Sequence, residues 1–207
     1  MNKNLMLYKK YFVENESERP ELFRVIKEKY GCTSAIYPGS FIHITPSLIF
    51  PHTVYVDSDR RVQKFFDDPE VIRWVRVKKE YADKPEIKAF QQNYTKKLPD
   101  AVGEFDLLIS QYAGFVSQDC KQYLKPDGIL LVNNSHADAG LAFLDPDYEL
   151  AAVANHNNGK WTIKENDLQD YFIPKKGLHP QKQTLLETMR GVAYKKTASN
   201  YIFKKIN

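Results

Sequence analysis

The sequence of 207 residues lacks the short motifs that assign a chemistry to a chain directly. It has no P-loop, no Gly-x-Ser-x-Gly nucleophile elbow and no Gly-x-Gly-x-x-Gly pattern, which disfavours NTPases, α/β-hydrolases and dinucleotide-dependent dehydrogenases. It also has no apolar run near the roughly 20 residues that a membrane-spanning helix needs, and Met1 to Asn4 lead into no signal-peptide core. We therefore expect a cytoplasmic protein without a membrane partner.

Cysteine and paired histidines are scarce as well. The two cysteines, Cys32 and Cys120, lie far apart in the sequence and without metal-type spacing, so we expect both to be reduced and structural. His52, His156 and His179 show no paired ligand spacing either. The sequence therefore predicts no metal site.

The composition is that of a folded soluble protein, with 43% apolar and 27% charged residues. The length fits one domain over residues 1–207, because single domains of about 100–200 residues bury enough surface to be stable alone. Part of the net charge of +4 comes from late lysine pairs, at 175–176, 195–196 and 204–205. Such pairs are usually solvated, and they leave nucleic acid open as a partner.

Strand-like and helical patterns alternate along most of the chain. A helical lead-in is expected over residues 1–30, and helices over 59–80, divided at Pro69, over 117–124, and over 168–190 with a break at 174–180. Strands are expected at 33–38, 53–57, 87–90, 105–110 and 129–134, and then at 148–154, 161–163 and 200–203. Strands separated by helices imply right-handed crossovers. We predict an α/β, Rossmann-like, doubly wound and mostly parallel sheet with antiparallel C-terminal strands and helices on both faces.

The clearest candidate site follows the first two predicted strands. Gly39 makes a turn after the first, and Asp57 directly follows the apolar part of the second. An acidic residue at that position can accept both hydrogen bonds of a ribose diol, so the order indicates a nucleotide-type site at the carboxyl edge of a parallel sheet. The alternative role for Asp57 is that of a helix N-cap, for which Asp59 is the better candidate.

Two further polar clusters follow later strands. Ser110, Gln111 and Tyr112 come after the strand at 105–110, where they either contact a ligand or begin a loop; Tyr112 either orients a nucleophile, stacks on a substrate ring or packs in the core. His136 and Asp138 follow the strand at 129–134 as a candidate general base with its orienting acid, and helix capping by Ser135 or Asp138 is the alternative.

The order of these motifs resembles the class I S-adenosylmethionine-dependent methyltransferases over residues 33–206. The strongest part is a strand at 106–110 followed by a helix, a Leu-Lys-Pro-Asp-Gly turn at 124–128 and a second buried strand. The resemblance implies S-adenosylmethionine as cofactor and an unidentified methyl acceptor. It places residues at the cofactor as follows: Tyr37, Gly39 and Ser40 near the methionine part, Asp57 and Ser58 at the ribose, Gln92 or Asn93 at the adenine, and Ser110 and Gln111 at the transferred group.

For such an enzyme, Tyr112 and His136 are the candidate catalytic residues. The resemblance also implies that residues 155–190, inserted before the last strand, form part of a substrate cover. The first motif of that family usually has three glycines, whereas this chain has Gly39 alone, with Phe41 and His43 nearby. An alternative is therefore a non-catalytic Rossmann-like module that has lost cofactor binding and acts through a protein partner. Modification of nucleic acid through the late lysine pairs is a third possibility. The oligomeric state is left open.

Overall fold

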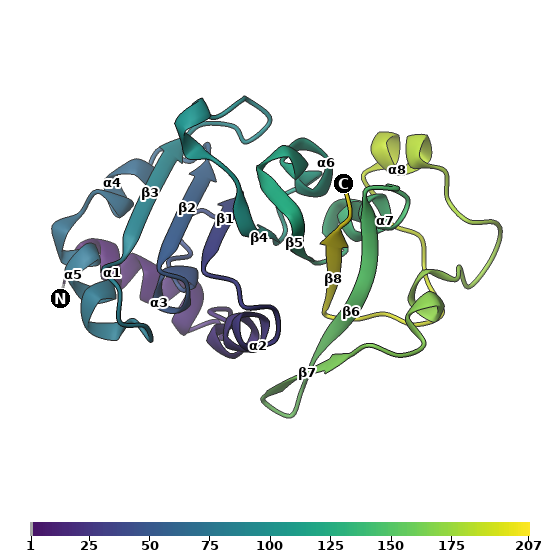
Figure 1. Ribbon diagram of the computed structural model, residues 1–207, viewed down its shortest axis with the longest axis horizontal. Coiled ribbons are helices and arrows are strands. Elements are labelled where there is room, and N and C mark those ends of the chain that lie inside the picture. Colours follow the sequence, from purple (N-terminus) through teal and green to yellow (C-terminus); the bar gives the residue numbers. More distant parts are fainter. Residues whose placement is uncertain (1) are drawn as a thin grey trace. The chain divides into compact units, whose positions relative to one another are not determined.

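The computed structural model describes residues 2–207, apart from the side chain of Ala101. The chain folds into two compact units, Met1–Leu98 and Pro99–Asn207 (Figure 1). No helix within residues 2–207 is long and apolar enough to cross a membrane.

The first unit contains three parallel strands, β1 (Ser34–Pro38), β2 (His52–Asp57) and β3 (Glu86–Gln91), in the order β3-β2-β1. Every residue of β1 is buried, as are the four central residues of β2, because both strands are apolar over continuous runs. β3 alternates between exposed and partly buried residues, as expected for a strand at the edge of the sheet. The carboxyl ends of β1 and β2 therefore meet at one edge, at Pro38 and Val56.

Helices surround these strands. They are α1 (Lys3–Tyr8), which continues into a π-helical turn (Lys9–Val13), α2 (Pro20–Tyr30), α3 (Pro46–Ile49), α4 (Val62–Phe66) and α5 (Pro69–Lys78). The predicted division at Pro69 is confirmed, since Asp68 caps α5 by accepting a 2.9 Å hydrogen bond from the Glu70 amide. α2 begins at Pro20 and ends at Gly31, whose φ of 68° is the left-handed conformation that closes helices.

The second unit contains β4 (Phe105–Ser110), β5 (Leu124–Val132), β6 (Tyr148–Asn157), β7 (Lys160–Lys164) and β8 (Asn200–Lys205), in the order β4-β5-β8-β6-β7. β4 and β5 are parallel, whereas β8 is antiparallel to both β5 and β6, beside which it lies in Figure 1. Asn158 and Gly159, at φ 50° and 77°, make the predicted hairpin turn between β6 and β7. β5 begins earlier than predicted, because Asp127 at φ 62° is accommodated within the strand.

The helical elements of the second unit are short. They are α6 (Val116–Asp119), α7 (Asp138–Phe143), α8 (Lys182–Thr188) and the 3-10 turns Asp100–Val102, Lys121–Tyr123, Ser135–Ala137 and Leu168–Phe172. The predicted helical pattern over 168–190 with a break at 174–180 is confirmed in outline, since Leu168–Phe172 and Lys182–Thr188 are helical and the chain between them is irregular. Pro174 and Gly177 favour the irregular chain, in which Pro174 forms an antiparallel bridge with Tyr194.

Candidate functional site

Asp57 ties the loop after β1 to the end of β2. Its Oδ2 accepts a 2.7 Å hydrogen bond from the Phe41 amide, and its Oδ1 accepts a 2.8 Å bond from the Asp59 amide. Gly39, at φ 67°, supplies the turn that precedes this contact, and its amide donates to the Val56 carbonyl at 2.7 Å. A carboxylate offers about four acceptor positions, so two remain for a ligand. Asp57 thus lies at a glycine turn with unused acceptor capacity.

The interpretation of Asp57 as an ordinary helix cap fits less well. α4 begins only at Val62, and Asp59 holds the turn before it, because its Oδ1 accepts the Arg61 amide at 2.8 Å. The Arg61 guanidinium also donates hydrogen bonds to both carboxylate oxygens of Asp59, at 2.8 and 2.7 Å. This contact lowers the pKa of Asp59 to about 2. Asp59 therefore holds the turn before α4, but it does not cap the helix, which has no side-chain cap.

His43 and Tyr37 belong to the interior of the first unit. The His43 Nε2 lies 2.9 Å from the Glu18 carbonyl, so it carries the proton and donates it, while Nδ1 accepts from the Tyr37 hydroxyl at 3.2 Å. Phe12 stacks on the imidazole at 4.4 Å between ring centroids. Burial lowers the pKa of His43 to about 3, which keeps the ring neutral. Both side chains therefore secure the N-terminal segment to β1.

Phe41 also turns toward the N-terminal segment. Its ring meets Tyr11 edge-on at 5.2 Å, and the Arg61 guanidinium lies 4.4 Å above its centroid. The backbone at Phe41 has a φ of 47°, which is costly for an aromatic residue and is held in place by these contacts together with the bond to Asp57. The bulky side chains in the first motif thus pack on other residues of the first unit.

The remaining candidates of the first unit stabilise turns. The buried Ser40 hydroxyl donates to the Phe41 carbonyl at 3.2 Å, and Ser58 is exposed. After β3, the Gln92 side-chain amide donates to the Lys96 carbonyl at 3.1 Å, and Asn93 Oδ1 accepts the Thr95 amide at 3.0 Å. The side-chain oxygen of Gln92 takes no part in these bonds.

In the second unit, Ser110 is joined to a buried carboxyl group. Its hydroxyl lies 2.5 Å from Asp138 Oδ2, and Oδ1 of the same carboxyl accepts the Ser117 hydroxyl at 2.6 Å. Asp138 is 1% exposed. Burial raises its pKa to about 7, and the serine hydrogen bonds partly offset that rise. A group that exchanges a proton near neutral pH therefore lies at the end of β4.

The predicted pairing of His136 with Asp138 does not form. The carboxyl of Asp138 is committed to Ser110 and Ser117, and the exposed His136 ring contacts Ser135 Oγ through Nδ1 at 2.8 Å. His136 and Ala137 both adopt left-handed conformations, at φ 56° and 66°, which turn the two side chains apart. Neither Ser135 nor Asp138 caps α7 through its side chain. Asn134 accepts the Gly140 amide at 3.2 Å in their place.

Three buried amides form a network that the sequence alone did not identify. Gln111 donates to Asn200 Oδ1 at 2.7 Å, and Asn133 donates to Gln111 Oε1 at 3.4 Å. Asn133 Oδ1 in turn accepts the backbone amide of Tyr112 at 3.4 Å. Tyr112 is 65% exposed at φ 59°, so it is not a core aromatic. The network fixes the backbone at the end of β4 and presents Tyr112 outward.

The segment predicted to cover a substrate is anchored on α7. Leu185 of α8 is buried against Ala137 and Leu141. Gly140 leaves room for this packing, because a Cβ there would approach Leu185 and the Tyr194 hydroxyl to 3.2 Å. The bridge between Pro174 and Tyr194 closes the base of the segment, with amide–carbonyl hydrogen bonds of 2.8 Å on either side. The segment therefore has a fixed base, and Gly191 at its end lies close to Asn134.

Comparison with known proteins shows that this chain is similar in fold to solved structures. No family model matches the sequence, and no curated protein is similar to it in sequence. Among solved structures, the O-methyltransferase TomG from Streptomyces achromogenes matches with a TM-score of 0.51 and 9% identity, over 79% of this chain and 87% of that one. An O-methyltransferase from Bacillus cereus matches with a TM-score of 0.51 and 8% identity, over 100% of this chain and 92% of that one. The chain therefore has the predicted Rossmann-like fold of the class I methyltransferases, with a mostly parallel sheet and antiparallel C-terminal strands.

Proposed function

We propose that this chain is an S-adenosylmethionine-dependent methyltransferase whose methyl acceptor is unidentified. The observation that carries the proposal is Asp57, which ends the second parallel strand, holds the glycine-turn loop through Phe41 and keeps acceptor positions for a ribose diol. The likeness in fold supports it, since TomG was crystallised in complex with SAM and the Bacillus cereus enzyme in complex with SAH.

The residues of the first unit fit such a cofactor in several respects. The left-handed Gly39 leaves the backbone after β1 accessible, and Phe41 and His43 turn their rings toward the N-terminal segment. We assign Gly39, Ser40 and the backbone of Tyr37 to the methionine part, and Asp57 and Ser58 to the ribose. Gln92 or Asn93 would accept from the adenine amino group through a side-chain oxygen.

In the second unit we assign Ser110 and Gln111 to the region of the transferred group. A bound sulfonium would supply a methyl carbon for in-line attack, so the protein acts chiefly by positioning and by excluding water. Tyr112, held outward by the bond from its amide to Asn133, would orient the acceptor. His136 would take up the acceptor proton at Nε2, since Nδ1 contacts Ser135. Residues 155–190 would cover the acceptor.

Calorimetric titration with S-adenosylmethionine and S-adenosylhomocysteine tests the cofactor, after mass spectrometry has excluded carried-over ligand. We expect saturable binding that Asp57→Ala weakens by about tenfold or more, because hydrogen bonds to a charged group are each worth about 1.5–3 kcal/mol. Asp59→Asn is the matched control, since it removes a neighbouring carboxylate that serves Arg61. Circular dichroism verifies that each variant is folded.

A second candidate function is that of a non-catalytic module that binds a protein partner. The observation in its favour is Phe41, which takes a left-handed conformation where the methyltransferases have glycine. Its ring also packs between Tyr11 and Arg61. Folded protein that binds neither cofactor form in calorimetry would select this candidate.

A further inference from the structure

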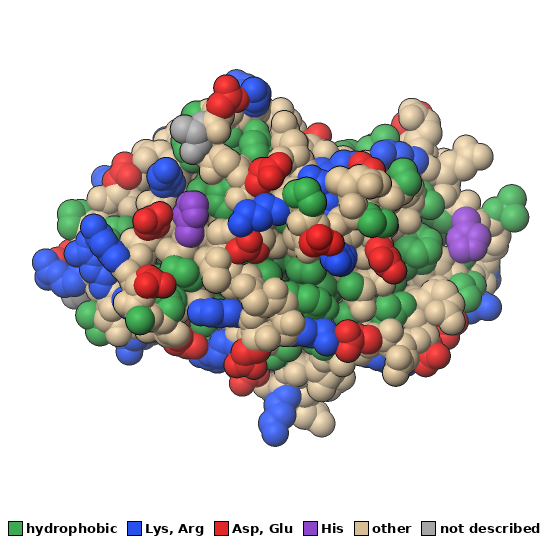
Figure 2. Space-filling view, in the orientation of Figure 1, with side chains coloured by type: hydrophobic (Ala, Val, Ile, Leu, Met, Phe, Trp, Pro, Cys, Tyr) green, Lys and Arg blue, Asp and Glu red, His purple; other side chains and the backbone are tan. Residues whose placement is uncertain are grey.

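A basic cavity lies in the first unit, and its lining includes none of the residues assigned to the cofactor. It has a volume of about 620 Å³ and is lined by α1, by the start of α4 and by the residue that precedes α5. Four cationic side chains line it, against one carboxylate; the cations are Lys3, Arg60, Arg61 and Lys64, and the carboxylate is Asp68. Figure 2 shows Lys and Arg side chains gathered over the part of this unit where Figure 1 places α5 and the N-terminus.

The carboxylate of this cavity is already satisfied by neutral donors. Asp68 accepts the side-chain amides of Asn2 and Asn4 at 2.9 and 2.7 Å, and the Glu70 backbone amide at 2.9 Å. These bonds lower the pKa of Asp68, with the bond from Asn2 as the largest cause. Asp68 therefore stays charged, but its hydrogen bonds come from neutral donors and fix the wall of the cavity.

One of the four cations is also committed. Arg61 is bound through two nitrogens to Asp59 and lies over the Phe41 ring. By contrast, no hydrogen bond or ion pair within residues 2–207 involves the side chain of Lys3, Arg60 or Lys64. Arg60 precedes α4 and Lys64 lies within it, four residues later, and Lys3 of α1 lines the same cavity. Three unpaired cations thus converge on one hollow.

A second hollow extends the basic surface along α1. It has a volume of about 350 Å³ and shares Lys3 and Leu7 with the first. Lys9 and Lys10 line it, against the single carboxylate of Glu14. The two hollows together therefore present five cationic side chains to a ligand with several negative charges. They are Lys3, Arg60 and Lys64, which are unpaired, and Lys9 and Lys10, which share their hollow with the one carboxylate of Glu14.

We propose that this cavity binds a phosphate ester. At neutral pH a phosphate monoester carries nearly two negative charges and each phosphodiester of a nucleic-acid backbone carries one, and the acceptor oxygens of either suit an arginine fork beside two lysines. The volume lies within the roughly 300–1,000 Å³ of ligand-binding pockets in general. The ester belongs either to a small phosphorylated molecule or to the backbone of a nucleic acid. The inference is independent of the proposed methyl transfer, because none of the cavity residues is assigned to the cofactor.

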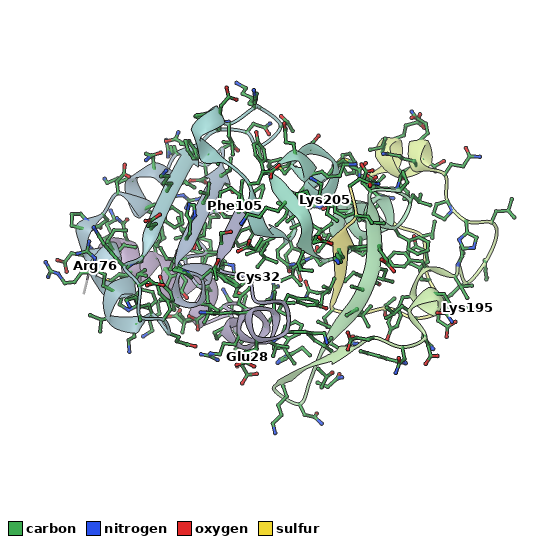
Figure 3. All side chains as sticks on the ribbon, viewed as in Figure 1. Glu28, Cys32, Arg76, Phe105, Lys195 and Lys205 are labelled. Atoms are coloured by element: carbon green, nitrogen blue, oxygen red, sulfur yellow. The ribbon has the colours of Figure 1, made fainter. Side chains whose placement is uncertain are left out.

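Titration with tripolyphosphate at low ionic strength tests the site, with a short single-stranded RNA as the second probe. The cavity variants are the double substitution Arg60→Gln/Lys64→Gln, before and within α4, and Lys3→Gln on α1. The matched control is Arg76→Gln, which removes an exposed cation on the outer part of α5 (Figure 3). All four positions are exposed, so each variant is expected to fold, and circular dichroism checks this.

We expect saturable tripolyphosphate binding that the double variant weakens by about tenfold or more, that Lys3→Gln weakens by a smaller factor, and that Arg76→Gln changes by less than about twofold. RNA that binds and responds to the same variants identifies the backbone of a nucleic acid as the source; tripolyphosphate binding alone identifies a small phosphate ester. Absence of saturable binding overturns the proposal. Equal weakening by the control also overturns it, because diffuse positive charge would then account for the binding.

Discussion

The Ser110 hydroxyl oxygen lies 2.5 Å from Oδ2 of Asp138, so the last residue of β4 and the first residue of α7 share a buried hydrogen bond. Burial raises the pKa of that carboxyl to about 7. Between about pH 4 and 7, the folded protein therefore holds a proton that the unfolded chain has released. Within this window, Asp138 makes stability fall as the pH rises.

Asp138→Asn is expected to remove this dependence. The asparagine oxygen can accept from Ser117 and its amide can donate to Ser110, so the local structure is retained. The wild type should lose up to about 1.4 kcal/mol per pH unit from this group across the window, and nothing further above pH 7. Urea unfolding at several pH values checks this, in a Trp74→Phe background where Trp161 of β7 reports on the second unit.

Asp127→Asn serves as the control for Asp138→Asn. Asp127 is an exposed carboxylate in the first part of β5, in the same unit, and is paired with Lys204 at 2.7 Å. Asparagine tolerates its left-handed backbone. The control should keep the wild-type slope. An Asp138→Asn variant with that same slope would show that Asp138 is ionised in the folded protein throughout the window.

His43 is expected to have the opposite effect in the first unit. Its pKa is lowered to about 3 by burial, so below about pH 6.5 the unfolded chain takes a proton that the folded chain does not. Stability should therefore fall with falling pH, by up to about 1.4 kcal/mol per unit, until the pH approaches the folded pKa. His43→Phe should flatten this acid limb. It should also cost about 1–3 kcal/mol at neutral pH, because Tyr37 and the Glu18 carbonyl lose their partner.

Urea unfolding of Trp161→Phe protein isolates this effect, because Trp74 of α5 then reports on the first unit. His52→Gln, at the partly exposed start of β2, is the control. A steep acid limb that survives in His43→Phe would assign the acid sensitivity to other groups.

Phe41→Gly tests whether the side chain in the first motif obstructs the proposed cofactor. The ring already packs on Tyr11 and under Arg61, so its removal should not increase affinity for S-adenosylhomocysteine by more than about twofold. The first unit should become less stable by about 1–2 kcal/mol, since the lost aromatic packing outweighs the relief of a left-handed backbone worth about 1 kcal/mol. Calorimetry and urea unfolding give the two quantities. A tenfold gain in affinity would instead mean that Phe41 blocks the site.

Much of the fold could be predicted because its signals are local. The apolar run of β4, the Pro-Asp-Gly turn before the buried part of β5 and the proline that divides α4 from α5 each specify structure within a few residues. Residues 168–190 show where this reasoning ends. The helical segments and the break between them have local signals, whereas the pairing of Pro174 with Tyr194 depends on a contact between separate segments of the chain.

The position of Asp57 at the end of β2 could be predicted, because it depends on one strand alone. A contact between two side chains could not be predicted in this way. His136 and Asp138 are neighbours in sequence, yet two left-handed residues direct them apart. Asn133 and Asn200 are distant in sequence, yet the pairing of β5 with β8 brings both to Gln111. The sequence shows a polar residue at each of these strand ends. Which of them form hydrogen bonds with one another follows only from the order and pairing of the strands.

Met189→Gly should stabilise the second unit. Met189 ends α8 at φ 52° and is 45% exposed, so glycine would relieve a left-handed backbone while losing little packing. We expect a gain of about 1 kcal/mol in urea unfolding followed by Trp161 fluorescence. Leu186→Gly, inside α8, is the matched control and should be destabilising, because glycine in a helix interior costs about 1 kcal/mol and Leu186 packs partly against the α7 cluster. Destabilisation by Met189→Gly would indicate that the methionine side chain anchors the cover.

Gly191→Ala should loosen the base of the cover through Asn134. A Cβ at Gly191 would lie 2.8 Å from Asn134 Nδ2, and Asn134 is the residue whose Oδ1 accepts the Gly140 amide at the start of α7. Displacing Asn134 to make room breaks that bond, so a loss of about 1 kcal/mol is expected. A double-mutant cycle with Asn134→Ala separates this mechanism from a general effect of alanine. Once Asn134 is truncated the clash is gone, so Gly191→Ala should cost little in that background. An equal cost in both backgrounds would mean that the glycine is required by its backbone, and that the cover is not anchored through Asn134.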